Sequence, residues 1–222
     1  QSVAYSGKNV KICASHAGLT LGEDGATHQI LEDIGMMKML PGMTVIVPCD
    51  YNQTKAATIA LGAHNGPAYL RFGRPSWPIF TPPDQQFVIG KADRLIEGKD
   101  ISIFACGHMV WQAIEAEEKL AAHGISAEVI NIHTIKPLDV EAILASVQKT
   151  GCAVTCEEHQ INGGLGDSVA QVLSRFHPAP LEMVAVNDSF GESGTPTQLL
   201  KKYGLSPDDI VAKAGNALAR KK

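Results

Sequence analysis

The chain has 222 residues and a formal net charge of −4, and 45% of its residues are hydrophobic. This composition is typical of a folded globular protein, and the length allows one large or two modest domains. Its longest basic run is the terminal Arg220-Lys221-Lys222, which makes nucleic acid and membrane surfaces poor candidates as partners. The sequence also shows no apolar stretch of membrane-spanning length.

Five cysteines stand at irregular spacing, and this odd number does not predict a disulfide framework. Four of them lie in apolar runs typical of strands and are predicted to be small buried residues: Cys13, Cys106, Cys152 and Cys156. The last two would share one face of a strand, but no nearby His/Cys pair has the spacing of zinc ligands. Free thiols fit a reducing compartment, and we expect a cytoplasmic protein.

The first part of the chain alternates strands with helices. Apolar residues at intervals near 3.6 predict its first helix, which Pro41-Gly42 ends. The expected elements are a strand at 10–14, a polar glycine-spaced loop at 15–25, a helix at about 27–40, a strand at 44–47, a helix at 52–61 and a strand at 68–72. Strands that alternate with helices through short loops predict a parallel sheet.

Residues 74–86 are rich in proline, which favours extended backbone, and they are the predicted linker between two domains. The second part repeats the alternation, with strands expected at 101–106, 127–132, 152–156 and 181–186, helices at 110–123, 138–149 and 166–176, and a helical end. We therefore predict an α/β fold of two three-layer αβα domains with mainly parallel sheets, divided into 1–80 and 81–222.

Four polar residues stand where strands of the first part are expected to end. His16 follows the first strand and Arg74 follows the third. Asp24 and His28 lie at the entry to the first expected helix. Because ligands bind at the carboxyl ends of the strands in an open parallel sheet, we expect these side chains to face one cleft.

The chemistry of these four side chains suits a phosphorylated polyol. Arg74 offers a planar fork of donors to phosphate, and His16 adds another donor. Asp24 can accept from a sugar hydroxyl, and His28 can give or take a proton near neutral pH. Simpler roles stay open, because Asp24 could cap the expected helix, Arg74 could pair with a carboxylate and His16 could pack a loop.

A longer motif resembles one family. Residues 15–29, SHAGLTLGEDGATHQ, are similar to the sugar-binding segment of transketolases. Shorter matches keep the family's order and approximate spacing: Leu40-Pro41, Val47-Pro48-Cys49-Asp50, Arg71-Phe72-Gly73-Arg74-Pro75, Ile135-Lys136-Pro137-Leu138-Asp139 and Glu157-Glu158-His159. The resemblance implies that 1–80 is the later half of a pyrimidine-binding domain and that 81–222 is a transketolase C-terminal domain.

The resemblance implies an activity and a role for each site residue. The family uses thiamine diphosphate to transfer a two-carbon ketol unit from a ketose phosphate to an aldose phosphate, as in the pentose phosphate pathway. By the resemblance, His16 and Arg74 hold the substrate phosphate and Asp24 reads a substrate hydroxyl. His28 would bind substrate, contact the cofactor and act in catalysis near the reacting carbonyl.

Some of the family's cofactor-binding features are not found in this sequence. It has no Gly-Asp-Gly…Asn signature for Mg²⁺, and the family's glutamate that protonates the cofactor lies upstream of the segment around His16. Gln1 is not an initiator methionine, so we expect that the sequence begins partway through a longer protein. We expect thiamine diphosphate and Mg²⁺ to be held mainly by residues outside this chain, with no metal ligand within it. The expected partner is a companion N-terminal transketolase subunit or segment, in a dimer or heterotetramer.

Alternatives from other classes stay open. The β-subunit of a 2-oxo-acid dehydrogenase and deoxyxylulose-phosphate synthase share the architecture, although the synthase usually has arginine at the position of His16. A non-catalytic dimerisation or regulatory module is the third alternative. The glycines at 163–166 lack the spacing of a dinucleotide motif and predict a tight loop, and Glu157-Glu158-His159 are predicted to be solvated or interface residues.

Overall fold

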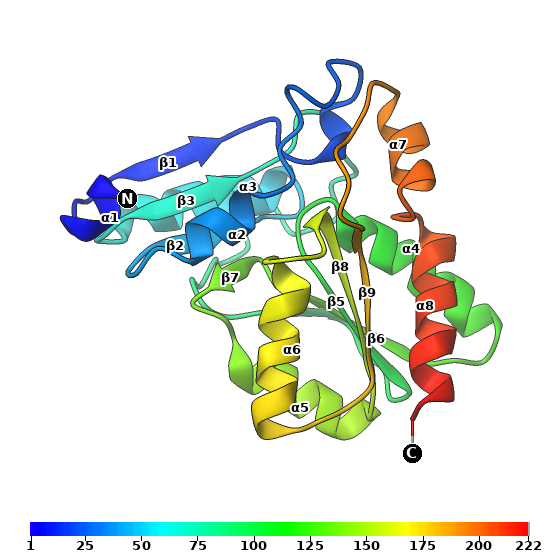
Figure 1. Ribbon diagram of the computed structural model, residues 1–222. Coiled ribbons are helices and arrows are strands. Elements are labelled where there is room, and N and C mark those ends of the chain that lie inside the picture. The colour runs from blue at the N-terminus through cyan, green and yellow to red at the C-terminus, as the bar shows by residue number, and fades with distance from the viewer. Residues whose placement is uncertain (222) are drawn as a thin grey trace.

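The protein contains two β-sheets in a computed structural model that describes residues 1–221 (Figure 1). The first sheet has the strand order β1-β3-β2-β7, with β1 at Lys11–Ala14, β2 at Thr44–Ile46, β3 at Ala68–Arg71 and β7 at Thr134–Lys136. The short helices α1 (Ser2–Tyr5) and α2 (Asp33–Lys38), the longer α3 (Tyr51–Ala63) and a 3₁₀ turn, η1 (Leu19–Leu21), accompany this sheet.

The second sheet has the order β4-β6-β5-β8-β9. Its strands are β4 (Asp93–Ile96), β5 (Ile101–Ala105), β6 (Ala127–Asn131), β8 (Ala153–Gln160) and β9 (Leu181–Val186). Helices α5 (Val140–Thr150) and α6 (Leu165–Phe176) cover one face, while α4 (Met109–Ala122) and α8 (Pro207–Ala219) cover the other, and α7 (Pro196–Lys202) packs near η1 (Figure 1). The predicted α/β class with mainly parallel sheets is confirmed, because only β4 and β7 pair antiparallel to a neighbour among the strands of residues 1–221.

Capping side chains and prolines mark the N-termini of several helices. The carboxylate of Asp50 accepts from the Gln53 N–H at the start of α3, and Asp139 caps α5 in the same way. A proline stands at the first position of α7 and of α8, where its missing N–H costs no helical hydrogen bond. The central strands β5 and β6 are buried on both faces along their whole length.

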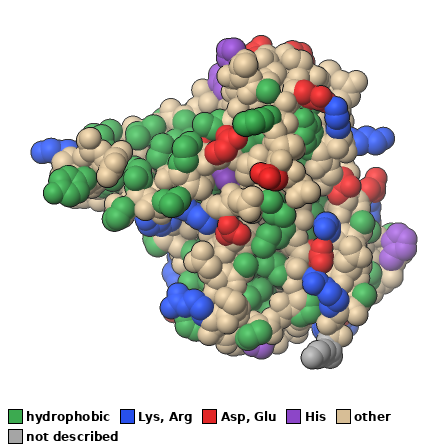
Figure 2. All heavy atoms as spheres, viewed as in Figure 1, with side chains coloured by type: hydrophobic (Ala, Val, Ile, Leu, Met, Phe, Trp, Pro, Cys, Tyr) green, Lys and Arg blue, Asp and Glu red, His purple; other side chains and the backbone are tan. Residues whose placement is uncertain are grey.

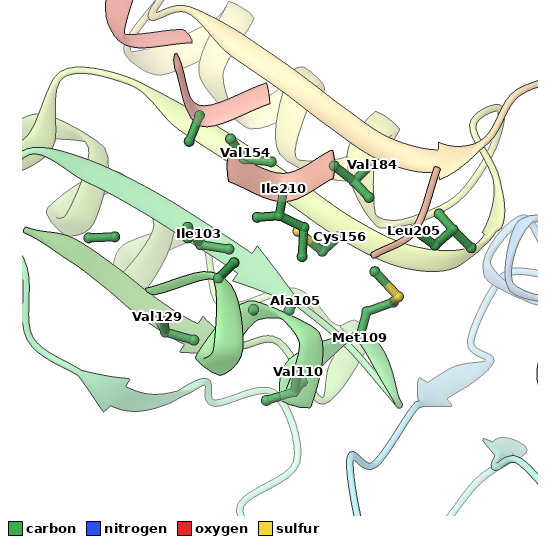
Figure 3. Packing of buried hydrophobic residues seen from close by; sticks show 14 of the residues in the cluster. Ile103, Ala105, Met109, Val110, Val129, Val154, Cys156, Val184, Leu205 and Ile210 are labelled. Carbon is green, nitrogen blue, oxygen red and sulfur yellow. The ribbon is translucent and has the colours of Figure 1, made fainter. Parts of the chain in front are cut away.

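The main core lies between the second sheet and helices α4 and α8. Figure 3 shows Ile103 and Val154 on adjacent strands, with Met109 of α4 and Ile210 of α8 lying over them. A second core cluster joins residues of both sheets, including Val45 of β2 and Ile130 of β6. The two sheets are therefore held together by apolar packing as well as by β7, which follows β6 in the chain yet pairs with β2.

The structure corrects three predictions about local structure. The helix expected at 27–40 is limited to α2, because 26–32 form turns in which the Gln29 amide donates to the carbonyls of Leu19 and Gly22. Strands β4 and β7 were not expected. Cys13 is exposed, since β1 is an edge strand, whereas the other predicted core cysteines are buried.

Hydrophobic side chains gather on the surface of the part that carries α1 and β1 (Figure 2). Tyr5 is 92% exposed and Val10 is 40% exposed. Within residues 1–221, no helix combines the length and the apolar character that crossing a membrane requires.

Candidate functional site

The loops that follow β1 and β3 run side by side at the carboxyl edge of the first sheet. The Phe72 N–H donates to the carbonyl of Ala14 at 3.0 Å, and the Ala17 N–H donates to the carbonyl of Phe72 at 3.3 Å. His16 lies between these two contacts, is exposed and has a positive φ of 68°, an uncommon backbone conformation for a residue other than glycine. The pairing of β1 with β3 thus brings the His16 loop beside the residues that precede Arg74.

Arg74 and Asp24 form an ion pair across these two loops. The Arg74 Nη1 atom lies 3.5 Å from Asp24 Oδ2 and donates to the carbonyl of Leu21 at 3.2 Å. Both side chains are about half exposed, at 46% and 50%. Within residues 1–221, Arg74 Nε and Nη2 have no hydrogen-bond partner, so the guanidinium keeps donors that an anion could use. Asp24 pairs with Arg74 instead of capping a helix.

His28 lies further along the same loop as Asp24. Its backbone N–H donates to the carbonyl of Gly25, and its Nδ1 atom lies 3.0 Å from the Thr27 hydroxyl. The side chain is exposed. The structure therefore brings Asp24 and Arg74 into contact and places His16 and His28 on the loops that carry them, while the roles of all four stay predictions.

A cavity of about 500 Å³ opens beside Arg74. Its walls come from three segments: 48–54 at the end of β2 and start of α3, 72–79 after β3, and His108 before α4. Of the four predicted residues, Arg74 lines this cavity. A positively charged group at the edge of a mixed polar and apolar cavity can fix one anionic end of a small ligand.

Comparison with known proteins places the two parts of the chain in one family. The family model of the transketolase pyrimidine-binding domain matches residues 1–78, and that of the transketolase C-terminal domain matches residues 90–210. The chain belongs to the transketolase family. The resemblance found in the segment 15–29 is thereby confirmed.

The transketolase relatives include subunits with different named substrates. The 6-deoxy-6-sulfo-D-fructose transketolase subunit of Clostridium sp. (strain MSTE9) is 44% identical over 220 residues, covering 99% of this chain and 68% of that protein. An apulose-4-phosphate transketolase subunit of Phocaeicola vulgatus is 38% identical over 213 residues, covering 96% of this chain and 68% of that protein. This chain thus spans about two thirds of the length of these transketolase subunits.

A solved structure confirms the transketolase fold. It is described as a split gene transketolase, inactive beta4 tetramer, and it matches with a TM-score of 0.94 at 45% identity. The match covers 100% of this chain and 71% of the other. A likeness of this extent shows that both parts of the chain take up the transketolase arrangement.

The segment Glu157-Glu158-His159 was predicted to be solvated or at an interface, and the solvated alternative is wrong, because Glu158 and His159 contact Thr20 and Gly35 of the first part of the chain. The three residues are 1%, 4% and 0% exposed at the end of β8, where the C-terminal domain of this transketolase chain faces the first sheet. The Glu157 carboxylate accepts from the N–H groups of Leu165 and Gly166 at 2.7 and 2.8 Å. The glycine-rich loop at 163–166 therefore binds a carboxylate of its own chain at the N-terminus of α6.

A buried ion pair between Arg71 of β3 and Asp33 of α2 lies beside this segment, and its arginine also contacts β8 of the second sheet. Arg71 Nε lies 2.8 Å from Asp33 Oδ2, which also accepts from the Tyr69 hydroxyl at 2.7 Å. Arg71 Nη2 donates to the carbonyl of Glu158 at 2.9 Å. Burial raises the pKa of Asp33, but the Arg71 charge and these hydrogen bonds outweigh burial and leave that pKa below its usual value. Residues from α2, β3 and β8 are thus fixed to one another.

The buried carboxyls of Glu157 and Glu158 predict a stability that depends on pH. Burial raises the pKa of each from 4.5 to about 7, although hydrogen bonds from backbone N–H groups and the charge of Arg71 act in the opposite direction. Between pH 4.5 and about 7, these two carboxyls bind more protons in the folded chain than in the unfolded chain. The free energy of unfolding should therefore fall as the pH rises from about 4.5 to about 7, by about 1.4 kcal/mol per pH unit for each carboxyl.

Urea unfolding measured across this pH window checks the prediction. Glu157→Gln and Glu158→Gln should each remove about half of the slope that the two carboxyls contribute, and the double variant should remove nearly all of it. A slope that is the same in the parent and the double variant would show that both groups titrate alike in the folded and unfolded chains.

Proposed function

We propose that this chain is the sugar-phosphate-binding part of a thiamine-diphosphate-dependent transketolase, which transfers a two-carbon ketol unit from a ketose phosphate to an aldose phosphate. The observation that carries the proposal is the Arg74–Asp24 pair, which bridges the loops after β1 and β3 at the edge of a cavity. The two relatives named above carry the names of different sugars, so the proposal extends to the class of ketose and aldose phosphates and not to one sugar.

The proposal assigns a role to each of the four polar residues. Arg74 and His16 bind the terminal phosphate of the sugar, since the free donors of Arg74 suit an anion of matching geometry. Asp24 accepts a hydrogen bond from a sugar hydroxyl and, through its contact with Arg74, holds the guanidinium in place. His28 moves a proton at the reacting oxygen and contacts the cofactor.

Thiamine diphosphate, when bound, supplies the carbanion that carries the two-carbon unit. In residues 1–221, no three side chains of His, Cys, Asp or Glu lie together as a metal site. We propose that the cofactor's diphosphate and Mg²⁺ are held mainly outside this chain, as the resemblance to the family implies.

We further propose a companion N-terminal transketolase subunit or segment, assembled with this chain as a dimer or heterotetramer. Two observations support it. Both relatives are named as subunits, and the similar solved structure is described as a split gene transketolase. The edge of β1 that faces away from β3 has no partner strand within residues 1–221, which leaves room for a further strand.

Arg74→Ala should weaken turnover of phosphorylated acceptors selectively. A charge-assisted bidentate contact is worth about 1.5–3 kcal/mol, so kcat/KM for ribose 5-phosphate should fall about ten- to a hundredfold. The value for glycolaldehyde, which has no phosphate, should stay within about twofold. Steady-state assays of the chain assembled with its companion measure both values.

Arg175→Ala is the matched control, because Arg175 lies on α6 and contacts the ring of Phe176. It should leave both acceptors unaffected. Equal losses for ribose 5-phosphate and glycolaldehyde in Arg74→Ala would refute the phosphate role.

A further inference from the structure

Two side chains of the second part of the chain, one buried and one 10% exposed, support the loops of the candidate site. Glu158 comes from β8 and His108 from the residue before α4, and both belong to the segment matched by the transketolase C-terminal domain. Glu158 is 4% exposed. Neither residue was singled out from the sequence as part of the site.

Glu158 holds the loop that follows β1. Its Oε1 atom accepts from the Thr20 N–H, and its Oε2 atom accepts from the Thr20 hydroxyl at 3.2 Å. Gly18 has a φ of +82°, and a Cβ at this position would collide with the Glu158 carboxylate, so the loop needs glycine there. Thr20 belongs to η1, whose next carbonyl, that of Leu21, accepts from Arg74.

His108 holds the loop that follows β3. Its ring stacks on Trp77, with ring centroids 4.4 Å apart and planes at 13°. A Cβ at Gly73, the residue before Arg74, would collide with the ring. The Trp77 Nε1–H also donates to the carbonyl of His108 at 3.1 Å. The chain on either side of Arg74 is therefore packed against one imidazole.

One hydroxyl connects these two supports. His108 Nδ1 lies 3.1 Å from the Thr20 hydroxyl oxygen. Burial, followed by the charge of Arg71, lowers the pKa of His108 to about 4, so the ring is neutral near pH 7. When Glu158 is ionised, the single hydroxyl proton of Thr20 points to Glu158, and His108 Nδ1–H donates to Thr20. This chain of hydrogen bonds places the proton of the neutral imidazole on Nδ1.

We propose that Glu158 and His108 of the C-terminal domain, together with Thr20 of the pyrimidine-binding domain, form a positioning bracket that sets the place and direction of the Arg74 guanidinium. The bracket fixes the loop carrying Leu21, to which Arg74 donates, and the loop carrying Gly73, from which Arg74 extends. These residues act through Arg74, and neither Thr20 nor Glu158 lines the cavity beside it. The proposal rests on the proposed phosphate role of Arg74.

Thr20→Val tests the bracket, because it removes the hydroxyl and keeps both the side-chain shape and the N–H that binds Glu158. We expect KM for ribose 5-phosphate to rise about tenfold with kcat nearly unchanged, since a positioned charged contact is weakened in substrate binding. KM for glycolaldehyde should change less than about twofold. Thr20→Ser keeps the hydroxyl and should restore the parent value. All variants are assayed above pH 7 in the chain assembled with its companion.

A double variant separates positioning from general destabilisation. If Thr20 acts through Arg74, then Thr20→Val added to Arg74→Ala should cause no further rise in KM for ribose 5-phosphate. Additive losses, equal losses for the two acceptors, or a parent-like KM in Thr20→Val would each overturn the bracket. Failure of Arg74→Ala to discriminate between the acceptors would instead refute the proposed function, so the two failures can be told apart.

A second pair of variants applies if Thr20→Val does not fold, as judged by thermal unfolding. His108→Asn places an amide N–H close to the position of His108 Nδ1, while His108→Leu provides no donor. KM for ribose 5-phosphate should rise about tenfold more in His108→Leu than in His108→Asn. Equal KM values in these two variants would overturn the bracket.

Discussion

Replacing Arg71 with methionine is expected to lower the free energy of unfolding by about 3–5 kcal/mol, a large loss for a single change. The variant leaves the Asp33 carboxylate buried without its cation, and it removes the donor to the carbonyl of Glu158. Methionine fills a similar volume, so the loss reports the charge and the hydrogen bonds more than an empty space. Urea unfolding monitored by circular dichroism gives the value.

Two further variants show whether the uncompensated charge causes this loss. Adding Asp33→Asn to Arg71→Met removes the charge and leaves an acceptor for the Tyr69 hydroxyl, so the double variant should recover part of the stability. Lys119→Met breaks an exposed ion pair with Asp208 and should cost less than about 1 kcal/mol. A similarly small loss in Arg71→Met, or no recovery in the double variant, would contradict the view that the uncompensated charge of Asp33 causes the loss.

Adding a companion that carries the family's Mg²⁺ signature and cofactor glutamate is expected to raise ketol transfer by more than about 10³-fold over this chain alone. Exposed apolar residues near β1 and the unpaired edge of that strand within residues 1–221 give the physical reason for assembly (Figure 2). Size-exclusion chromatography should show the complex, and coupled assays with xylulose 5-phosphate and ribose 5-phosphate should show the activity.

A variant of the predicted catalytic residue supplies the control for this experiment. His28→Ala should assemble with the companion, because His28 is exposed on a loop, yet it should support much less turnover. Ketol transfer by the 222 residues alone would contradict the proposal that a companion holds the cofactor's diphosphate and Mg²⁺. In that case the cofactor site would have to be sought within this chain, with the exposed Glu23 as the first residue to replace.

The candidate site was predicted in part from the sequence. A contiguous motif placed His16, Asp24 and His28 on one loop, and Arg74 followed a recognisable strand. The contact of Arg74 with Asp24 was only one of several possibilities, since about 50 residues of intervening chain could place either residue elsewhere. The bracket had no sequence signal of its own, because Glu158 and Thr20 lie 138 positions apart.

The sequence alone determined the features that depend on neighbouring residues. The helices expected at 52–61, 138–149 and 166–176 lie within about two residues of the observed bounds of α3, α5 and α6, and the alternation of strands with helices indicated mainly parallel sheets. These signals act over one or two turns of chain, so they can be read without the tertiary structure.

Only the tertiary structure decided the features that depend on distant segments. It placed β7 in the first sheet beside β2, restricted the expected helix at 27–40 to α2, and buried Glu157, Glu158 and His159 between the two parts of the chain. Buried charged groups are stable only where partners complete their hydrogen bonds, and here those partners come from Thr20, Gly35 and the start of α6. Such partners are chosen by packing in three dimensions, because the free energy of burying a charge depends on which groups surround it and not on its neighbours in sequence.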